Sequence, residues 1–223
     1  MSVASDAVGG PLTVTTATAI DVSAVVDPLF REYGEWVAGR LEQDSGITFT
    51  DADLARHHDA FRRELPRLLG SRGRLLVARL GDDPVGVGTL KPVDGTTAEI
   101  KRMYVRPAAQ GLGVGRAILT RLLQDARAEG YATVRLETLR FMTAAQAMYR
   151  VFDFVEVARF DGSEAADTGA RTTHHLHGAR ARAVTGQRPL PGQVACSAVS
   201  PTGGPAGVTP AAARTEEHER SAE

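Results

Sequence analysis

Three glycines in one short segment mark the part of this sequence best suited to chemistry. They lie in Gln110–Arg116, which reads QGLGVGR. An alternating run precedes it at Glu99–Val105 and an amphipathic run follows from Ile118 to Ala126, which predicts a strand, a glycine-rich turn and a helix. The first N–H groups of such a helix are unpaired, and the helix dipole adds positive charge there. The turn is therefore a candidate anion site, best suited to phosphate.

Two common phosphate-binding loops do not fit these residues. A P-loop requires Lys and then Ser or Thr after its last glycine, where this chain has Arg116 and Ala117. A dinucleotide-binding loop requires glycine at position 116 and a turn entered directly from the strand. A plain strand-to-helix turn, with glycines needed only for geometry, remains as a competing interpretation.

The segment resembles the pyrophosphate loop of the GNAT superfamily, the acyl-CoA-dependent N-acyltransferases. The family pattern is Gln or Arg, two residues, Gly, one residue, then Gly or Ala, and Gln110, Gly113 and Gly115 fill it. Met103–Pro107 and Ala147–Tyr149 also stand where the family has further signatures. The resemblance implies an α/β fold with a mixed central sheet and helices on both faces.

The resemblance also implies a ligand, acetyl-CoA as co-substrate, and no metal. The loop residues that would hold its pyrophosphate are Gln110, Gly111, Leu112, Gly113, Val114, Gly115 and Arg116. In the family, backbone N–H groups near the end of the preceding strand face the pantetheine and the thioester oxygen. The corresponding residues here are Met103, Tyr104 and Val105. Donors of this kind stabilise negative charge that develops on the oxygen, typically by a few kcal/mol.

Acyl transfer to an amine also requires a base, because the amine is protonated near pH 7. The resemblance assigns this role to Glu99, near the start of the strand that leads to the loop. An ordinary strand-edge carboxylate paired with Lys101 or Arg102 is an equally good interpretation of Glu99. Glu137, on the neighbouring strand, is the reserve candidate.

Tyr149 matches the family position whose phenol lies near the CoA sulfur and can protonate the departing thiolate. A tyrosine on an amphipathic helix is more often a core residue, so the assignment depends on the motif. The family's usual Gly-Phe after this tyrosine is Asp153-Phe154 here, and the bulky Val151 and Phe152 precede it. If a positive φ is needed at position 153, Asp is among the better substitutes for glycine but still costs energy.

The elements that must position these residues follow from the periodicity of the apolar positions. Strands are predicted at 12–17, 74–80, 84–91, 97–105, 133–139 and 154–160, and helices at 21–41, 51–66, from the loop to Gly130, and at 143–152. Pro28 is tolerable only in the first turn of its helix, so Asp27 is expected to be the cap. The strands on either side of the glycine-rich loop and its helix should be parallel neighbours. In the GNAT fold, the first two helices wall the acceptor side.

Three segments are expected along the 223 residues. Residues 1–11 are a disordered N-terminus, 12–177 an acetyltransferase domain, and 178–223 a low-complexity tail rich in Ala, Gly and Pro that is predicted to be disordered. The family usually closes its sheet with one more strand after Phe160. Arg171–His177 could supply it, although its pattern is weak.

Composition excludes several other classes of protein. The net charge of −1 gives no reason to expect a nucleic-acid or membrane-surface partner. The single Cys196 excludes a disulfide framework and has no neighbouring His, which argues against a cysteine acyl-enzyme mechanism. The His174–His177 segment has no partner cluster for a metal. No apolar run could span a bilayer and Met1–Gly10 lacks signal-peptide features, so we expect a cytoplasmic protein.

The sequence thus predicts an N-acetyltransferase that moves an acetyl group from acetyl-CoA to a primary amine by direct attack in a ternary complex. The acceptor would be a small-molecule or peptide amine, and the chain could form a homodimer. One alternative is a catalytically weak or inactive acyl-CoA-binding sensor, because residues 151–153 depart from the family pattern. Another is a truncated or misread carboxyl end whose product folds poorly.

Overall fold

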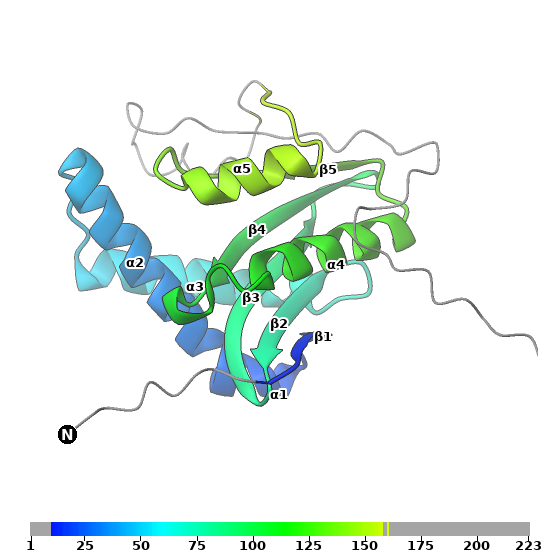
Figure 1. Cartoon of the computed structure of the whole chain (residues 1–223), viewed down its shortest axis with the longest axis horizontal. Helices are drawn as coiled ribbons and strands as arrows, with labels where there is room; N and C mark the ends of the chain where they lie inside the picture. The colour runs from blue at the N-terminus through cyan, green and yellow to red at the C-terminus, as the bar shows by residue number, and fades with distance from the viewer. Residues whose placement is uncertain (1–9, 158–159, 161–223) are drawn as a thin grey trace, which may run out of the picture. The chain divides into compact units, whose positions relative to one another are not determined.

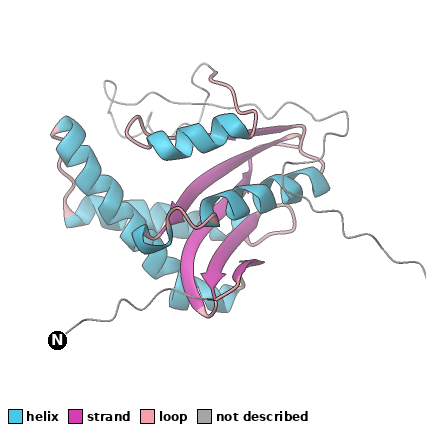
Figure 2. Cartoon of the chain, viewed as in Figure 1, coloured by secondary structure: helices cyan, strands magenta, loops and turns pink. Residues whose placement is uncertain are grey.

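The computed structural model describes residues 10–157 and residue 160 of the chain. These residues contain a five-stranded mixed sheet in which the strands follow their sequence order (Figures 1 and 2). The strands are β1 (Leu12–Thr16), β2 (Arg74–Leu80), β3 (Asp83–Pro92), β4 (Thr97–Val105) and β5 (Thr133–Leu136). Pairing is antiparallel from β1 to β4 and parallel between β4 and β5, as predicted. The expected mixed α/β sheet is confirmed.

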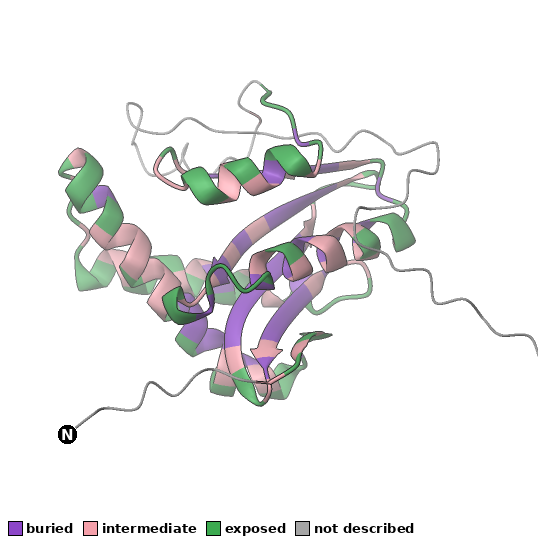
Figure 3. Cartoon of the chain, in the orientation of Figure 1, coloured by how far each residue is buried: buried purple, intermediate pink, exposed green. Residues whose placement is uncertain are grey.

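Helices cover both faces of this sheet. One face carries α2 (Asp27–Ser45) and α3 (Asp51–Leu68), and the other carries α4 (Val114–Ala128) and α5 (Thr143–Val151). The side chains of β2 alternate between them: Leu75 and Val77 pack with α2 and α3, whereas Leu76 and Leu80 pack with α4. The central strands are therefore buried on both sides, while the helices keep an exposed outer face (Figure 3).

The entry into α2 differs from the expected one. A short helix, α1 (Ala19–Asp21), and a π-helical turn (Val22–Val26) precede α2, so the helical segment begins before residue 21. Its N-cap is Thr18, whose backbone N–H and hydroxyl both donate to Asp21 at 2.8 Å. The expectation that Asp27 is the cap was therefore wrong. The π turn widens the helix just before Pro28, which relieves the clash that a proline causes in a regular α-helix.

Asp27 has a tertiary role instead. It is 6% exposed, it is ion-paired with Arg62 of α3, and its Oδ1 lies 3.3 Å from Nε2 of His58. These contacts join the start of α2 to the middle of α3. They also show that His58 does not lie on a solvated polar face, as its helix pattern suggested, because its side chain is only 20% exposed.

The other boundaries lie close to the predicted ones, with three differences. α3 begins at Asp51 as expected, behind an N-cap at Thr50, but it continues through Pro66 to Leu68. β5 ends at Leu136, three residues earlier than expected. Within the described part of 154–160, the structure has a single bridge residue, Val157, in place of the predicted strand. Arg171–His177, the 178–223 tail and residues 1–9 lie outside the described residues.

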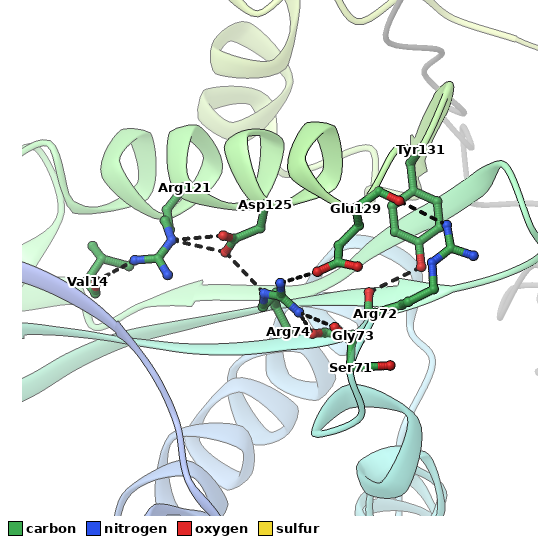
Figure 4. Close-up of polar contacts among 9 residues, drawn as sticks. All are labelled: Val14, Ser71, Arg72, Gly73, Arg74, Arg121, Asp125, Glu129 and Tyr131. Atoms are coloured by element: carbon green, nitrogen blue, oxygen red, sulfur yellow. Dashed lines mark hydrogen bonds and ion pairs between the residues drawn. The ribbon is translucent and has the colours of Figure 1, made fainter. Parts of the chain in front are cut away.

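A polar network on α4 fixes this helix against the sheet (Figure 4). Arg74 of β2 is ion-paired with Asp125 and Glu129 of α4, at 3.7 and 2.5 Å. Arg121 donates to both carboxylate oxygens of Asp125 at 3.0 and 3.1 Å, and to the carbonyl of Val14 on β1 at 3.4 Å. These charge-assisted contacts are largely shielded from water, so they set the position of α4 and of the loop that enters it.

Candidate active site

The glycine-rich loop has the conformation that its sequence predicted. Gly111 and Gly113 have φ angles of 81° and 83°, in the left-handed region that favours glycine. Gly113 is the N-cap residue of α4, and no side chain caps the helix there. The loop therefore needs its first two glycines for backbone geometry, before any ligand is considered.

The start of α4 presents unpaired backbone donors. The first hydrogen bond of the helix runs from the N–H of Ala117 to the carbonyl of Gly113, at 3.0 Å. Within the described part of the chain, the N–H groups of Val114, Gly115 and Arg116 have no backbone acceptor. A Cβ on Gly115 would make only ordinary contacts, 3.7 Å from the sulfur of Met148 at the nearest. The protein itself thus leaves room at Gly115, which fits a ligand that approaches this backbone.

Gln110 connects the loop to β4. Its side-chain amide donates to the carbonyl of Val105 at 3.1 Å, so the first residue of the motif fixes the loop to the end of the strand. Arg116 lies over the ring of Phe152 at 5.5 Å, and the side chain of Leu112 is exposed. The predicted cofactor-binding residues of β4 and of the loop are therefore neighbours.

β4 contains a β-bulge between Lys101 and Tyr104. Val87 and Thr89 of β3 pair with Tyr104 and Lys101, so two residues of β4 oppose one residue of β3. Arg102, the first bulge residue, has a φ of 52°. The pairing of β4 with β5 ends at Ile100 and Leu136, just before the bulge. Met103, Tyr104 and Val105 therefore lie where β4 has separated from β5, and Figure 1 shows β5 beside only one end of β4.

Tyr149 of α5 lies close to this separation. Its hydroxyl is 3.9 Å from the sulfur of Met103, and its ring packs on Phe154 with centroids 5.8 Å apart. Burial, with a smaller effect from Tyr33, raises the pKa of Tyr149 well above its ordinary value. The phenol therefore stays protonated at neutral pH and is available as a proton donor. Asp153 has the positive φ, 62°, that its place in the family pattern called for.

Glu99 lies in the interior of the sheet. It is 2% exposed, and its Oε2 accepts a hydrogen bond from Nη2 of Arg135 on β5 at 3.2 Å. The strand-edge interpretation was therefore wrong, because β4 is flanked by β3 and β5 and the partner is neither Lys101 nor Arg102. The parallel register places Glu99 directly beside Arg135, which the sequence of one strand cannot reveal.

Glu99 and Tyr149 approach β4 from opposite faces. Ala98 and Ile100 pack in the core under α4, so Glu99 between them points toward the face of α2 and α3. Tyr149 contacts β4 from the face of α4 and α5. The structure gives no direct contact between the two residues, and only a ligand that passes through the separation of β4 and β5 could meet both.

Ion pairs on the face of α2 and α3 were missed by the sequence analysis. Lys91, Lys101 and Arg102 surround Glu64 of α3, with Nζ of Lys101 at 3.7 Å and Nη1 of Arg102 at 2.5 Å. Burial alone would raise the pKa of Glu64, but the charges of these residues outweigh it and lower the pKa to about 2. No periodic signal marks these residues, since a charged residue on a helix is usually solvated.

A second missed pair joins α2 to the glycine-rich loop region. Arg106 follows β4, and its guanidinium donates to both carboxylate oxygens of Glu32 on α2, at 2.9 and 2.5 Å. It also donates to the carbonyl of Pro84 at 2.8 Å. A bidentate pair of this kind has a fixed geometry, so α2 is held next to the residues that lead into the loop.

A cleft of about 310 Å³ lies between α2 and α3. Phe30 and Tyr33 of α2 and His57 and Phe61 of α3 line it, and it reaches the bulge at Arg102. The rings of Tyr33 and Tyr104 are 5.7 Å apart, which brings the cleft next to the residues of β4 assigned to the thioester. The two helices thus wall a cleft on the face where an acceptor was expected.

Two other features bear on the expected ligands and location. Residues 10–157 and 160 contain no group of three or more His, Cys, Asp or Glu side chains arranged to hold a metal ion. The His174–His177 segment lies outside these residues. None of the helices in the same range is long and apolar enough to cross a membrane.

Comparison with known proteins agrees with this geometry. A family model described as Acetyltransferase (GNAT) family matches residues 40–154, about half of the chain. An IAA acetyltransferase from Azospirillum brasilense is 38% identical over 88 residues, which are 39% of this chain and 58% of that protein. An uncharacterized N-acetyltransferase, YjgM of Escherichia coli, is 26% identical over 140 residues, or 61% of this chain and 75% of that protein.

Solved structures extend the likeness to the fold. PaiA N-acetyltransferase from Thermoplasma acidophilum, in complex with coenzyme A, superposes with a TM-score of 0.54 at 19% identity and covers 69% of this chain and 94% of its own. A GNAT family acetyltransferase from Staphylococcus aureus gives 0.53 at 17% identity, over 69% and 90% of the two chains. At such identities, the likeness concerns the fold alone.

Proposed function

Because the chain belongs to the acetyltransferase (GNAT) family, we propose that it transfers the acetyl group of acetyl-CoA to a primary amine by direct attack in a ternary complex. The observation that carries the proposal is the position of the loop donors. The unpaired N–H groups at the start of α4 lie at the end of the same strand whose separation from β5 is covered by Tyr149.

In this proposal, the loop residues Gln110 to Arg116 bind the pyrophosphate of acetyl-CoA. Their unpaired N–H groups and the dipole of α4 supply the attraction, and Gly115 supplies the room. The pantetheine would then lie between β4 and β5, where the backbone of Met103, Tyr104 and Val105 has no strand partner on the β5 side. These N–H groups would stabilise the charge that develops on the thioester oxygen.

Glu99 and Tyr149 would move the protons. The ionised Glu99 accepts a proton from the attacking amine, through water because its own side chain is almost fully buried. Attack forms the carbon–nitrogen bond and breaks the carbon–sulfur bond, and the electron pair of the latter goes to the sulfur. Tyr149, which burial keeps protonated, donates its proton to that thiolate. The acceptor would reach the thioester from the cleft between α2 and α3.

The decisive experiment is thiol release from acetyl-CoA, measured over a panel of amines. The panel would hold amino acids, polyamines, aminoglycosides and peptides with free amino termini. Release that depends on both substrates and yields an acetylated amine would support the proposal. Binding of acetyl-CoA without turnover on any amine would instead favour the sensor alternative.

Three finer expectations belong to the same proposal. The acceptor is a small-molecule or peptide amine, the protein is cytoplasmic, and residues 12–177 form the acetyltransferase domain. A homodimer is the fourth, and light scattering of the purified chain would test it. The departure at residues 151–153 gives less support to the sensor alternative than its sequence suggested, since Asp153 adopts a glycine-like φ and Tyr149 still contacts Met103.

A further inference from the structure

The bulge of β4 contains a backbone conformation that requires support. Arg102 has a φ of 52°, and bulges with a left-handed first residue normally have glycine there. A residue with a Cβ is rare in this region and persists only where its surroundings hold it. Arg102 is also 8% exposed, so these surroundings are protein. The question is which contacts hold the bulge open.

Thr89 of β3 makes one such contact. Its side chain is fully buried, and its hydroxyl donates to the carbonyl of Lys101 at 2.9 Å. This carbonyl belongs to the peptide group that leads into Arg102, so the hydrogen bond fixes the plane of that peptide at the point where β4 leaves its regular register. Valine would fill the same space without burying a hydroxyl, which makes the hydroxyl costly unless the bond is needed.

The side chain of Arg102 provides a second contact. Its guanidinium is bound to Glu64 of α3 at 2.5 Å and lies over the ring of Phe61, 5.5 Å from the centroid. Arg102 is thus held from the preceding peptide by Thr89 and from its own side chain by α3. The next three residues of the strand are Met103, Tyr104 and Val105, so their N–H groups point where this arrangement directs them.

We infer that Thr89 is a positioning residue for acetyl transfer: its buried hydroxyl holds the Lys101–Arg102 peptide and thereby directs the backbone donors of Met103 to Val105 toward the thioester oxygen. This inference rests on the proposed function, because these donors have a catalytic role only if acetyl-CoA binds between β4 and β5. Thr89 touches no substrate and acts only through the backbone of β4.

Two variants separate the hydroxyl from the shape of the side chain. Thr89→Val keeps the volume and removes the donor, whereas Thr89→Ser keeps the donor and removes a methyl group. We expect Thr89→Val to lower kcat by at least about tenfold, because misdirected donors weaken transition-state stabilisation. We expect Thr89→Ser to stay within about threefold of wild type, although its lost methyl group lowers the melting temperature. CoA, which lacks the thioester, should bind both variants as it binds wild type.

A merely structural role would give the opposite order, with kcat following the melting temperature. Equal impairment of the Val and Ser variants, or wild-type turnover by the Val variant, would overturn the inference. If the Val variant does not fold, Thr89→Ala replaces it in the comparison with Thr89→Ser. A crystal structure of the donor-free variant gives a readout that needs no turnover: we expect Arg102 to leave the left-handed region or the Met103 N–H to turn. An unchanged bulge would overturn the inference, whereas absence of thiol release from wild type would overturn only the proposed function.

Discussion

The hydroxyl of Tyr149 lies 3.9 Å from the sulfur of Met103, which joins the last described helix to the strand just beyond the bulge of β4. Met103 is also the first of the residues whose backbone is proposed to face the thioester. The proposed proton donor and the proposed oxyanion donors therefore meet at one point, although 46 residues separate them in the sequence.

Tyr149→Phe tests the proton donor. We expect kcat to fall by at least about tenfold, or 1.4 kcal/mol of barrier, while the affinity for acetyl-CoA stays within a few fold because only a hydroxyl is lost. Burial raises the pKa of Tyr149, so the rate of the wild type should show no decline from its ionisation at mildly alkaline pH. Steady-state kinetics with calorimetric binding would measure both effects. A Phe variant as fast as wild type would remove Tyr149 from the mechanism.

Glu99→Gln tests the base. We expect kcat to fall by about two to three orders of magnitude with acetyl-CoA binding intact, the usual size for one acid-base group. The wild-type rate should rise with pH to a plateau, and the variant should lose that rise. Because the change also removes the charge that faces Arg135, its melting temperature must be measured alongside. Glu137→Gln is the matched control, and if it alone loses activity the base has been assigned to the wrong strand.

Gly113→Ala and Gly115→Ala separate the two uses of glycine in the loop. Gly113 has a φ of 83°, so alanine there should destabilise the ligand-free protein by roughly 1–2 kcal/mol. Gly115 is helical and open, so alanine should not lower the melting temperature without ligand. CoA at a hundred times its dissociation constant should stabilise wild type by about 2.7 kcal/mol, measured by thermal denaturation. Both variants should lose most of this shift, and full retention in Gly115→Ala would argue against pyrophosphate at this position.

Glu64→Gln tests the ion pairs of α3. The surrounding cations lower the pKa of Glu64 from 4.5 to about 2, so its carboxylate stabilises the folded state above pH 4.5. That contribution is lost as the pH falls toward 2. We therefore expect Glu64→Gln to be less stable at pH 7, and its free energy of unfolding to depend less on pH between 4.5 and 2 than that of wild type. Denaturant titrations at several pH values would measure this.

A control for Glu64 lies on the neighbouring helix. Glu35 is an exposed carboxylate of α2, so Glu35→Gln should change neither the stability at pH 7 nor its pH dependence. Parallel pH profiles for wild type and Glu64→Gln would show that the three cations do not hold Glu64 in its ionised form.

The sequence by itself determined the features that depend on neighbouring residues. The loop at Gln110–Arg116, the strand at Arg74–Leu80 and the start of α3 at Asp51 were all predictable. Each follows from local rules: glycine supplies positive φ, alternation of apolar residues marks a strand buried on one face or two, and Thr50 with Asp53 caps a helix. The family motif and its anion-binding donors are local in the same sense.

The tertiary structure decided the features that depend on register between distant segments. Only the parallel pairing of β4 with β5 places Arg135 beside Glu99, and only the packing of α3 brings Glu64 to Arg102. The positive φ of Arg102 could not be predicted, since a bulge arises from a mismatch in length between two paired strands. A charged or hydroxyl side chain looks the same in sequence whether it meets water or a buried partner, so its role becomes visible only when the fold removes the water.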